Sequence, residues 1–140
     1  MTTADRSTSP ATRVLIVDDE EDIALLLADG LEARGFSTYV AHDGSGALQV
    51  VEEYGTDVAL LDLALPDIDG CEVARRLLAR GPDDLLLVAV TAFSDSQHRA
   101  DAAAAGFADY VVKPIMLDNL AQRIRELVDQ QAAHHAARPG

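Results

Sequence analysis

Two groups of acidic residues in this chain have types and positions suited to chemistry. Asp18 and Asp19 follow the apolar run 14–17, and Asp62 follows the apolar run 58–61. Carboxylates that meet within a few ångströms raise their pKa values, share protons or bind a cation. Because no paired His or Cys lies near these oxygen donors, we expect a hard ion, Mg²⁺, with Mn²⁺ as a substitute.

Two more residues extend this set. Thr91 follows the apolar run 85–90, and Lys113 follows the run 108–112. A carboxylate nucleophile, a divalent cation, a hydroxyl and an ammonium group together suit phosphoryl transfer, with Asp62 as the nucleophile. Taken singly, Asp62 could cap a helix, Thr91 could be a β-branched strand end and Lys113 a surface lysine. Their shared position at the ends of apolar runs favours the chemical interpretation.

The elements that must position these residues alternate between strands and helices. Strands are predicted at 14–17, 36–41, 58–61, 85–90 and 108–112, helices with apolar stripes at 23–31, 47–54, 73–78 and 117–128, and a weakly packing, alanine-rich helix at 94–105. This alternation predicts an α/β fold, a doubly wound (βα)5 flavodoxin-like three-layer sandwich with a parallel sheet. The sequence alone does not set the strand order, but the order 2-1-3-4-5 would bring the three carboxylates together.

Composition narrows the class of protein. The 140 residues suffice for one domain, and the longest apolar runs are far shorter than the roughly 20 residues of a membrane span. Acidic residues outnumber basic ones 24 to 11, giving a net charge of −13 without a Lys/Arg cluster, which argues against direct nucleic acid binding. A single cysteine excludes an internal disulfide and agrees with a reducing compartment, so we expect a cytoplasmic protein without a membrane partner.

The ordered set of motifs resembles the receiver domain of two-component response regulators. The matching residues are the pair Asp18-Asp19, Asp62 followed by Leu65-Pro66-Asp67-Ile68-Asp69-Gly70, Thr91, and Lys113-Pro114. The resemblance covers about residues 12–130 and also underlies part of the expected strand order. Beside the expected receiver domain at 13–130, composition predicts a flexible N-terminal arm at 1–12 and a flexible C-terminal tail at 131–140.

The resemblance implies a role for each matching residue. Asp62 would accept a phosphoryl group from a histidine kinase or a histidine phosphotransfer protein, so the protein would be a phosphoacceptor and not a turnover enzyme. Asp19, Asp62 and the backbone carbonyl of Ala64 would bind Mg²⁺, with Asp18 acting largely through water. Thr91 and Lys113 would contact the phosphoryl oxygens, and the bond before Pro114 is commonly cis in the family.

Signalling is implied to run through a conformational change. Tyr110 occupies the family's aromatic switch position, where a shift of Thr91 would free space for its ring; alternatively it is a strand aromatic that packs on the alanine-rich helix. The affected face comprises the helix at 94–105, the strand at 108–112 and the last helix, through which family members often form homodimers. Whether this chain does so is left open, as are the kinase and the downstream target.

Several alternatives remain. The chain could be a stand-alone receiver, which we expect, or a receiver excised from a longer hybrid kinase or regulator. A Mg²⁺-dependent phosphohydrolase with an aspartyl nucleophile would need a second carboxylate as acid and base, and Ala64 stands where one would be useful. A flavodoxin-like nucleotide carrier would need a glycine-rich phosphate loop after Val17, where acids stand instead. In the family, the positions of Ala64 and Phe93 influence the lifetime of the aspartyl phosphate. Ala64 has no side chain that could order a hydrolytic water and Phe93 is bulky, so a fairly stable phosphorylated form is expected.

Overall fold

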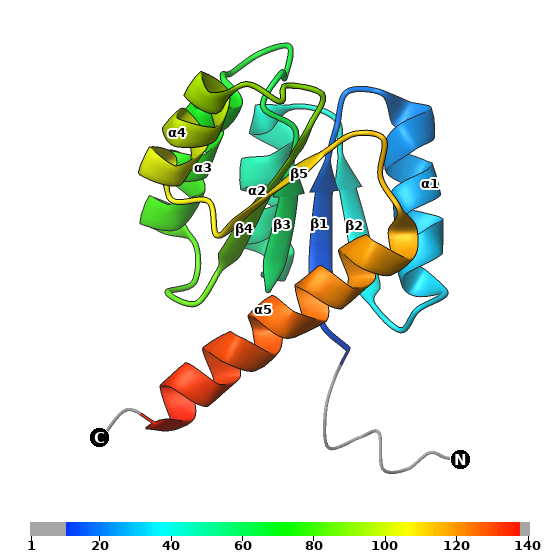
Figure 1. Ribbon diagram of the computed structural model, residues 1–140, viewed down its shortest axis with the longest axis vertical. Coiled ribbons are helices and arrows are strands. Elements are labelled where there is room, and N and C mark those ends of the chain that lie inside the picture. Colours follow the sequence, from blue (N-terminus) through cyan, green and yellow to red (C-terminus); the bar gives the residue numbers. More distant parts are fainter. Residues whose placement is uncertain (1–10, 138–140) are drawn as a thin grey trace.

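Five parallel strands form the sheet on which the molecule is built (Figure 1). The structure is a computed structural model that describes the backbone of residues 11–137 and the side chains of residues 11–133. The strands are β1 (Arg13–Val17), β2 (Ser37–Ala41), β3 (Val58–Leu61), β4 (Leu86–Thr91) and β5 (Asp109–Val112). Their order is β2-β1-β3-β4-β5 and each pairing is parallel, which confirms the predicted doubly wound α/β fold.

Five helices cover the two faces of this sheet. They are α1 (Glu21–Glu32), α2 (Gly44–Tyr54), α3 (Gly70–Arg80), α4 (Ser96–Ala105) and α5 (Leu117–Ala137). Helices α1 and α5 pack on one face, and α2, α3 and α4 pack on the other. This arrangement follows from right-handed crossovers, which place successive helices above or below the sheet according to the direction of the next strand.

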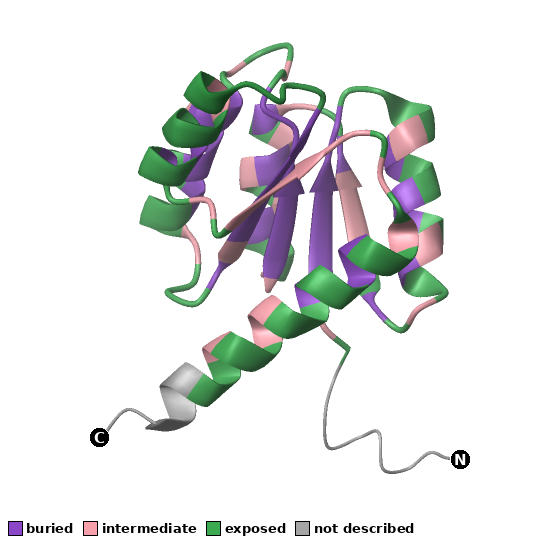
Figure 2. Cartoon of the chain, viewed as in Figure 1, coloured by how far each residue is buried: buried purple, intermediate pink, exposed green. Residues whose placement is uncertain are grey.

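The central strands are buried on both faces, as Figure 2 shows. In β1, Val14 and Ile16 belong to the core under α1 and α5, whereas Leu15 and Val17 belong to the core under α2, α3 and α4. Alternate side chains of a strand point to opposite faces, so a strand covered on both sides must be apolar throughout. The first polar residue after each such strand therefore stands at the carboxyl edge of the sheet.

The start of α4 and the end of α5 differ from the sequence prediction. Helix α4 begins at Ser96, two residues later than expected, because Asp95 is its N-cap and accepts the backbone N–H of His98 at 3.0 Å. Helix α5 continues to Ala137, past the predicted end of the domain at residue 130, because Gln and Ala in this segment have high helix propensity. Most of the predicted N-terminal arm, residues 1–10, lies outside the described residues, as do residues 138–140 of the predicted tail.

The packing of helix α4 agrees with the sequence prediction. Helix α4 buries only Ala102 and Ala105, so the alanine-rich helix indeed presents little apolar surface to the sheet. Helix α1 is followed by Gly35 at a φ of 96°, a left-handed conformation that glycine adopts without a Cβ clash. In the part of the chain that the structure describes, no helix is both long and apolar enough to cross a membrane.

Candidate functional site

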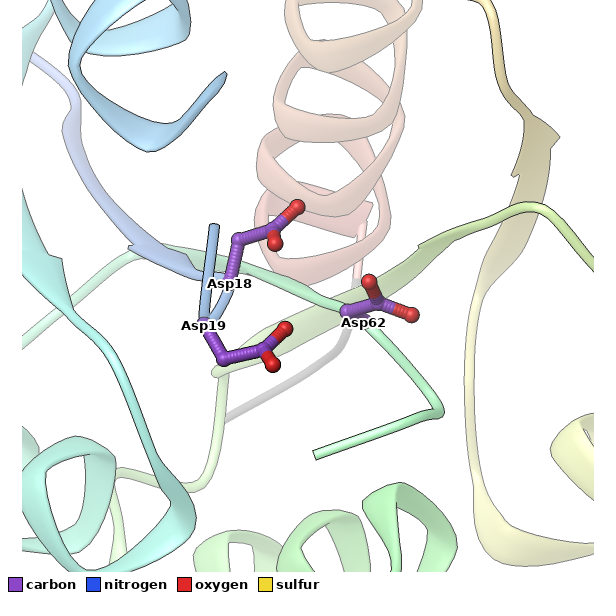
Figure 3. A group of neighbouring side chains, drawn as sticks. All are labelled: Asp18, Asp19 and Asp62. Atoms are coloured by element: carbon purple, nitrogen blue, oxygen red, sulfur yellow. The ribbon is translucent and has the colours of Figure 1, made fainter. Parts of the chain in front are cut away.

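Three carboxylates meet at the carboxyl edge of the sheet, where β1 and β3 lie side by side (Figure 3). One oxygen each of Asp18, Asp19 and Asp62 lies within 4.8 Å of the others. Asp18 and Asp62 are buried, whereas Asp19 is exposed. The backbone N–H of Asp62 donates to the Val17 carbonyl at 3.0 Å, which continues the strand pairing into the site and fixes the two strand ends relative to each other.

The ammonium group of Lys113 lies between two of these carboxylates. Its Nζ donates to Asp18 Oδ2 at 2.7 Å and to Asp62 Oδ2 at 3.0 Å, and Glu20 Oε1 lies 3.8 Å away. Burial lowers the pKa of Lys113, but the hydrogen bonds and the negative charges of Asp18 and Asp62 outweigh it, so the pKa is raised. Lys113 is therefore charged at neutral pH and offsets part of the repulsion within the acidic cluster.

Backbone N–H groups hold the other oxygen of each buried carboxylate. Asp18 Oδ1 accepts the N–H of Glu20 at 3.0 Å, and Asp62 Oδ1 accepts the N–H of Ala64 at 3.1 Å. Each carboxylate is thus oriented by one ammonium and one backbone contact. A carboxylate oxygen has more than one lone pair, so these contacts leave acceptor capacity for a cation.

The donor set fits a magnesium ion. Mg²⁺ binds oxygen ligands at about 2.1 Å in octahedral geometry, so two of its ligands lie about 3–4 Å apart. The three carboxylate oxygens lie within 4.8 Å of one another, so they need to draw together by at most about 2 Å to become neighbouring ligands of one ion. Asp18, Asp19 and Asp62 are the residues that would hold the ion.

Thr91 and Tyr110 lie beyond the acidic cluster, on β4 and β5. Thr91 is fully buried at the end of β4, and its hydroxyl oxygen accepts a long hydrogen bond of 3.4 Å from the N–H of Phe93. The Tyr110 hydroxyl donates to the Phe93 carbonyl at 2.8 Å, and the guanidinium carbon of Arg99 lies 4.7 Å from the ring centroid. Burial is the main cause that raises the pKa of Tyr110. The ring therefore contacts α4 through Arg99 and the β4–α4 loop through Phe93.

The loop after β5 brings Lys113 into the site. The N–H of Lys113 donates to the Thr91 carbonyl at 2.9 Å, which extends the pairing of β4 and β5. The Lys113–Pro114 peptide bond is cis, in agreement with what the resemblance implied. The structure thus brings Asp18, Asp19, Asp62 and Lys113 into one cluster, places Thr91 at the neighbouring strand end, and puts Ala64 in contact with Asp62 through its N–H.

Sequence reasoning missed two contacts next to the site. Glu20 Oε1 lies 3.8 Å from Lys113 Nζ. The Phe93 ring stacks on His98 with centroids 4.0 Å apart, and His98 in turn bonds the Asp95 carboxylate at 2.7 Å. The position of Glu20 directly after the acidic pair was a usable signal, whereas the Phe93–His98 stack depends on how the β4–α4 loop folds.

Comparisons with known proteins agree with this geometry. A family model described as "Response regulator receiver domain" matches residues 14–125. "Response regulator MprA" of Mycobacterium bovis is 35% identical over 127 residues, covering 91% of this chain and 55% of the relative. "Transcriptional regulatory protein KdpE" of Mycobacterium tuberculosis is 38% identical over 122 residues, covering 87% of this chain and 53% of the relative. The chain thus spans about half the length of the curated relatives it matches.

A solved structure extends the comparison to three dimensions. The crystal structure of a response regulator receiver domain protein (CheY-like) from Methanospirillum hungatei JF-1 has a TM-score of 0.84 and 27% sequence identity, and the match covers 89% of this chain and 98% of that one.

Proposed function

Since the chain belongs to the response regulator receiver domain family, we propose that Asp62 accepts a phosphoryl group from a histidine kinase or a histidine phosphotransfer protein in a Mg²⁺-dependent reaction. The observation that carries this proposal is the contact of Lys113 with both Asp18 and Asp62, next to the Asp19 carboxylate. A protein of this kind is a phosphoacceptor, and Asp62 is the residue modified.

The reaction is a displacement at phosphorus. A carboxylate oxygen of Asp62 attacks the phosphorus atom of a phosphohistidine, a P–O bond forms, the P–N bond breaks, and its electron pair returns to the imidazole. Asp19, Asp62 and the Ala64 carbonyl would hold Mg²⁺, with Asp18 acting largely through water, and the bound ion would supply positive charge to the phosphoryl oxygens. Lys113 places a further positive charge beside Asp62, and the Thr91 hydroxyl donates to a phosphoryl oxygen.

The surface beside the site fits a protein donor. A groove of about 450 Å³ is lined by Ile23, Leu26 and Leu27 of α1 and by the segment around Lys113 and Pro114. Leu26, which lines this groove, is 69% exposed. A donor histidine must come within bonding distance of Asp62, so its protein must contact this rim, and apolar side chains there give it a surface to bind.

The output is a conformational change that starts at Thr91. Phosphorylation adds about −1.5 to −2 charges and strong hydrogen-bond acceptors at Asp62. Thr91 moves toward these oxygens, Tyr110 fills the space it leaves, and α4 shifts together with the face it forms with β5 and α5. The small buried surface of α4, Ala102 and Ala105, supports a low cost for this motion. That face is the proposed contact with a downstream protein or a second copy of the chain.

The test is chemical modification with a small phosphodonor. Incubated with Mg²⁺ and acetyl phosphate, the protein should gain the mass of one phosphoryl group, and EDTA or Asp62→Asn should abolish the gain. Asp83→Asn removes an exposed carboxylate from the α3–β4 loop at the opposite edge of the sheet, and it should leave modification unchanged. Persistent phosphorylation of Asp62→Asn would refute the site, and turnover of small phosphate esters would favour a phosphohydrolase instead.

The relay through Tyr110 has a separate test. In the beryllofluoride-treated protein, Tyr110→Ala should be modified normally at Asp62 but should lose the change in size or partner binding that the wild type shows. A Tyr110→Ala variant that still changes in the same way as the wild type counts against the relay and leaves the phosphorylation site in place.

A further inference from the structure

The carboxylate of Asp67 ties the loop after Asp62 to the start of α2. Its Oδ1 accepts the N–H of Gly44 at 2.8 Å, and its Oδ2 accepts both the N–H and the hydroxyl of Ser45 at 3.1 Å. The first N–H groups of a helix have no partner within the helix, and the positive end of the helix dipole favours a carboxylate. The hydrogen bond from Gly44 is the main cause that lowers the pKa of Asp67, so this side chain is ionised at neutral pH.

Close packing accompanies these hydrogen bonds. A Cβ atom placed on Gly44 would lie 2.8 Å from Val73 Cγ2 of α3 and 3.2 Å from Ile68 Cβ of the loop. Only a glycine lets the loop and α3 approach the start of α2 this closely. The base of the same loop is closed by the N–H of Gly70, which donates to the Leu63 carbonyl at 3.1 Å. The loop is therefore held at its base by its own backbone and at its tip by α2.

The position of this loop directly affects the hydrogen bonding of the Asp62 carboxylate. The N–H of Ala64 donates to Asp62 Oδ1 at 3.1 Å, so a shift of the loop backbone moves a hydrogen-bond donor of the nucleophile. The Ala64 carbonyl, proposed as a magnesium ligand, belongs to the same short segment. Groups that hold metal ligands in place affect metal binding without touching the ion.

Resting on the proposed function, we infer that Asp67 is a positioning residue for the Asp62 site. Its bonds to Gly44 and Ser45 hold the 62–70 loop so that Asp62 and the backbone of Ala64 keep the arrangement that binds Mg²⁺ and receives the phosphoryl group. Asp67 acts through the loop and not by contact with the phosphoryl group.

Helix α2 offers a matched control for this inference. Asp43, its N-cap, accepts the N–H of Gly46 at 2.7 Å. Asp43→Ala therefore removes a carboxylate cap from the same helix without releasing the 62–70 loop. Comparing it with Asp67→Ala separates loss of helix capping from loss of loop position.

The experiment measures Mg²⁺ binding by calorimetry and the rate of acetyl phosphate modification over a range of Mg²⁺ concentrations. We expect Asp67→Ala to weaken Mg²⁺ binding about tenfold, the low end of the effect of residues that support metal ligands. At saturating Mg²⁺ its modification rate should approach that of the wild type, because the binding free energy of the ion then offsets the cost of ordering the loop. Asp67→Asn keeps one carbonyl oxygen for Gly44 and should be intermediate. Asp43→Ala should bind Mg²⁺ like the wild type, although both alanine variants lower Tm.

The outcomes separate this inference from the proposed function. Equal Mg²⁺ affinity in Asp67→Ala and Asp43→Ala would overturn the positioning role while leaving phosphorylation of Asp62 intact. A wild-type protein that is not modified, or a modified Asp62→Asn, would overturn both. Should Asp67→Ala fail to fold, Ser45→Ala and Asp67→Asn decide: each removes part of the contact, and wild-type Mg²⁺ affinity in both would refute the inference.

Discussion

Replacing Lys113 with methionine tests how the acidic cluster is balanced. The ammonium group lies 2.7 Å from Asp18 Oδ2 and 3.0 Å from Asp62 Oδ2. At an effective dielectric constant of about 20, each pair has a gross attraction of about 5–6 kcal/mol. Two carboxylate oxygens 4.8 Å apart repel each other by about 3.5 kcal/mol under the same assumption. The cation and the carboxylates thus offset one another, and removing the cation leaves the repulsion.

The net loss is smaller than the gross attraction because burial of Lys113 also costs desolvation. Removing one partner of a buried pair typically destabilises a protein by about 3–5 kcal/mol. The Lys113 side chain is still 15% exposed, so solvent screening favours the low end, about 3 kcal/mol in the absence of Mg²⁺. For a chain of this length that corresponds to a fall in Tm of roughly 10 °C. Mg²⁺ brings positive charge to the same carboxylates, so it should recover most of the loss.

The assay is urea unfolding followed by circular dichroism, since the chain contains no tryptophan, in EDTA and in saturating Mg²⁺. Arg123→Met is the control: Arg123 is 48% exposed and pairs with Asp109 at 2.9 Å, so its loss should cost less than about 1 kcal/mol and should not respond to Mg²⁺. Equal losses of stability in the two variants would refute this charge balance, as would a Lys113→Met variant that Mg²⁺ stabilises no more than it stabilises the wild type.

Two further predictions concern the loops around the site. Gly70→Ala should lower the free energy of unfolding in urea by about 1–3 kcal/mol and should slow modification by acetyl phosphate. The new Cβ would lie 2.6 Å from Leu63 Cα and 2.8 Å from the Asp62 carbonyl oxygen, which are backbone atoms that cannot move freely. A variant as stable and as reactive as the wild type would contradict this prediction. Hydrogen bonds from His98, first its backbone N–H and then its ring, lower the pKa of Asp95, so the stability Asp95 contributes is present above its unfolded-state pKa of about 3.9 and is lost as pH falls through the lower folded-state value. The Tm of Asp95→Ala should therefore be lower than that of the wild type at pH 7, and the difference should shrink below about pH 4. A difference that grows in acid would contradict a stabilising role of the ionised Asp95 carboxylate.

The parts of the molecule that sequence predicted well are those set by local pattern and chain order. Apolar runs such as 58–61 predicted the positions of the strands, and the polar residue that follows each run indicated the carboxyl edge of the sheet. Once β1 and β3 are neighbours, Asp18, Asp19 and Asp62 must converge, so the acidic cluster follows from topology. The predicted end of the last helix was wrong. The polar composition of the segment after residue 130 suggested a flexible tail, but its Gln and Ala residues favour helix, and α5 continues to Ala137.

Contacts between distant segments could not be predicted in the same way. The bonds of Asp67 to Gly44 and Ser45 join residues 22 or 23 positions apart, and no local pattern distinguishes Asp67 from other loop carboxylates. The guanidinium of Arg99 over the Tyr110 ring likewise depends on how α4 sits against β5. The roles assigned to Ala64 and Tyr110, and the predicted cytoplasmic location, stay predictions.

Strand β1 has a charged contact at each end. At its amino end, Arg13 pairs with Asp57 at 3.2 Å, immediately before β3, and at its carboxyl end Asp18 binds Lys113 at 2.7 Å. The four apolar residues between Arg13 and Asp18 set a fixed distance between these contacts, at about 3.3 Å per residue. Inserting one apolar residue into β1 would leave both faces of the strand apolar but would break one of the two contacts. The position of Asp18 in the site therefore depends on the anchoring of β1 by Arg13 at the opposite edge of the sheet.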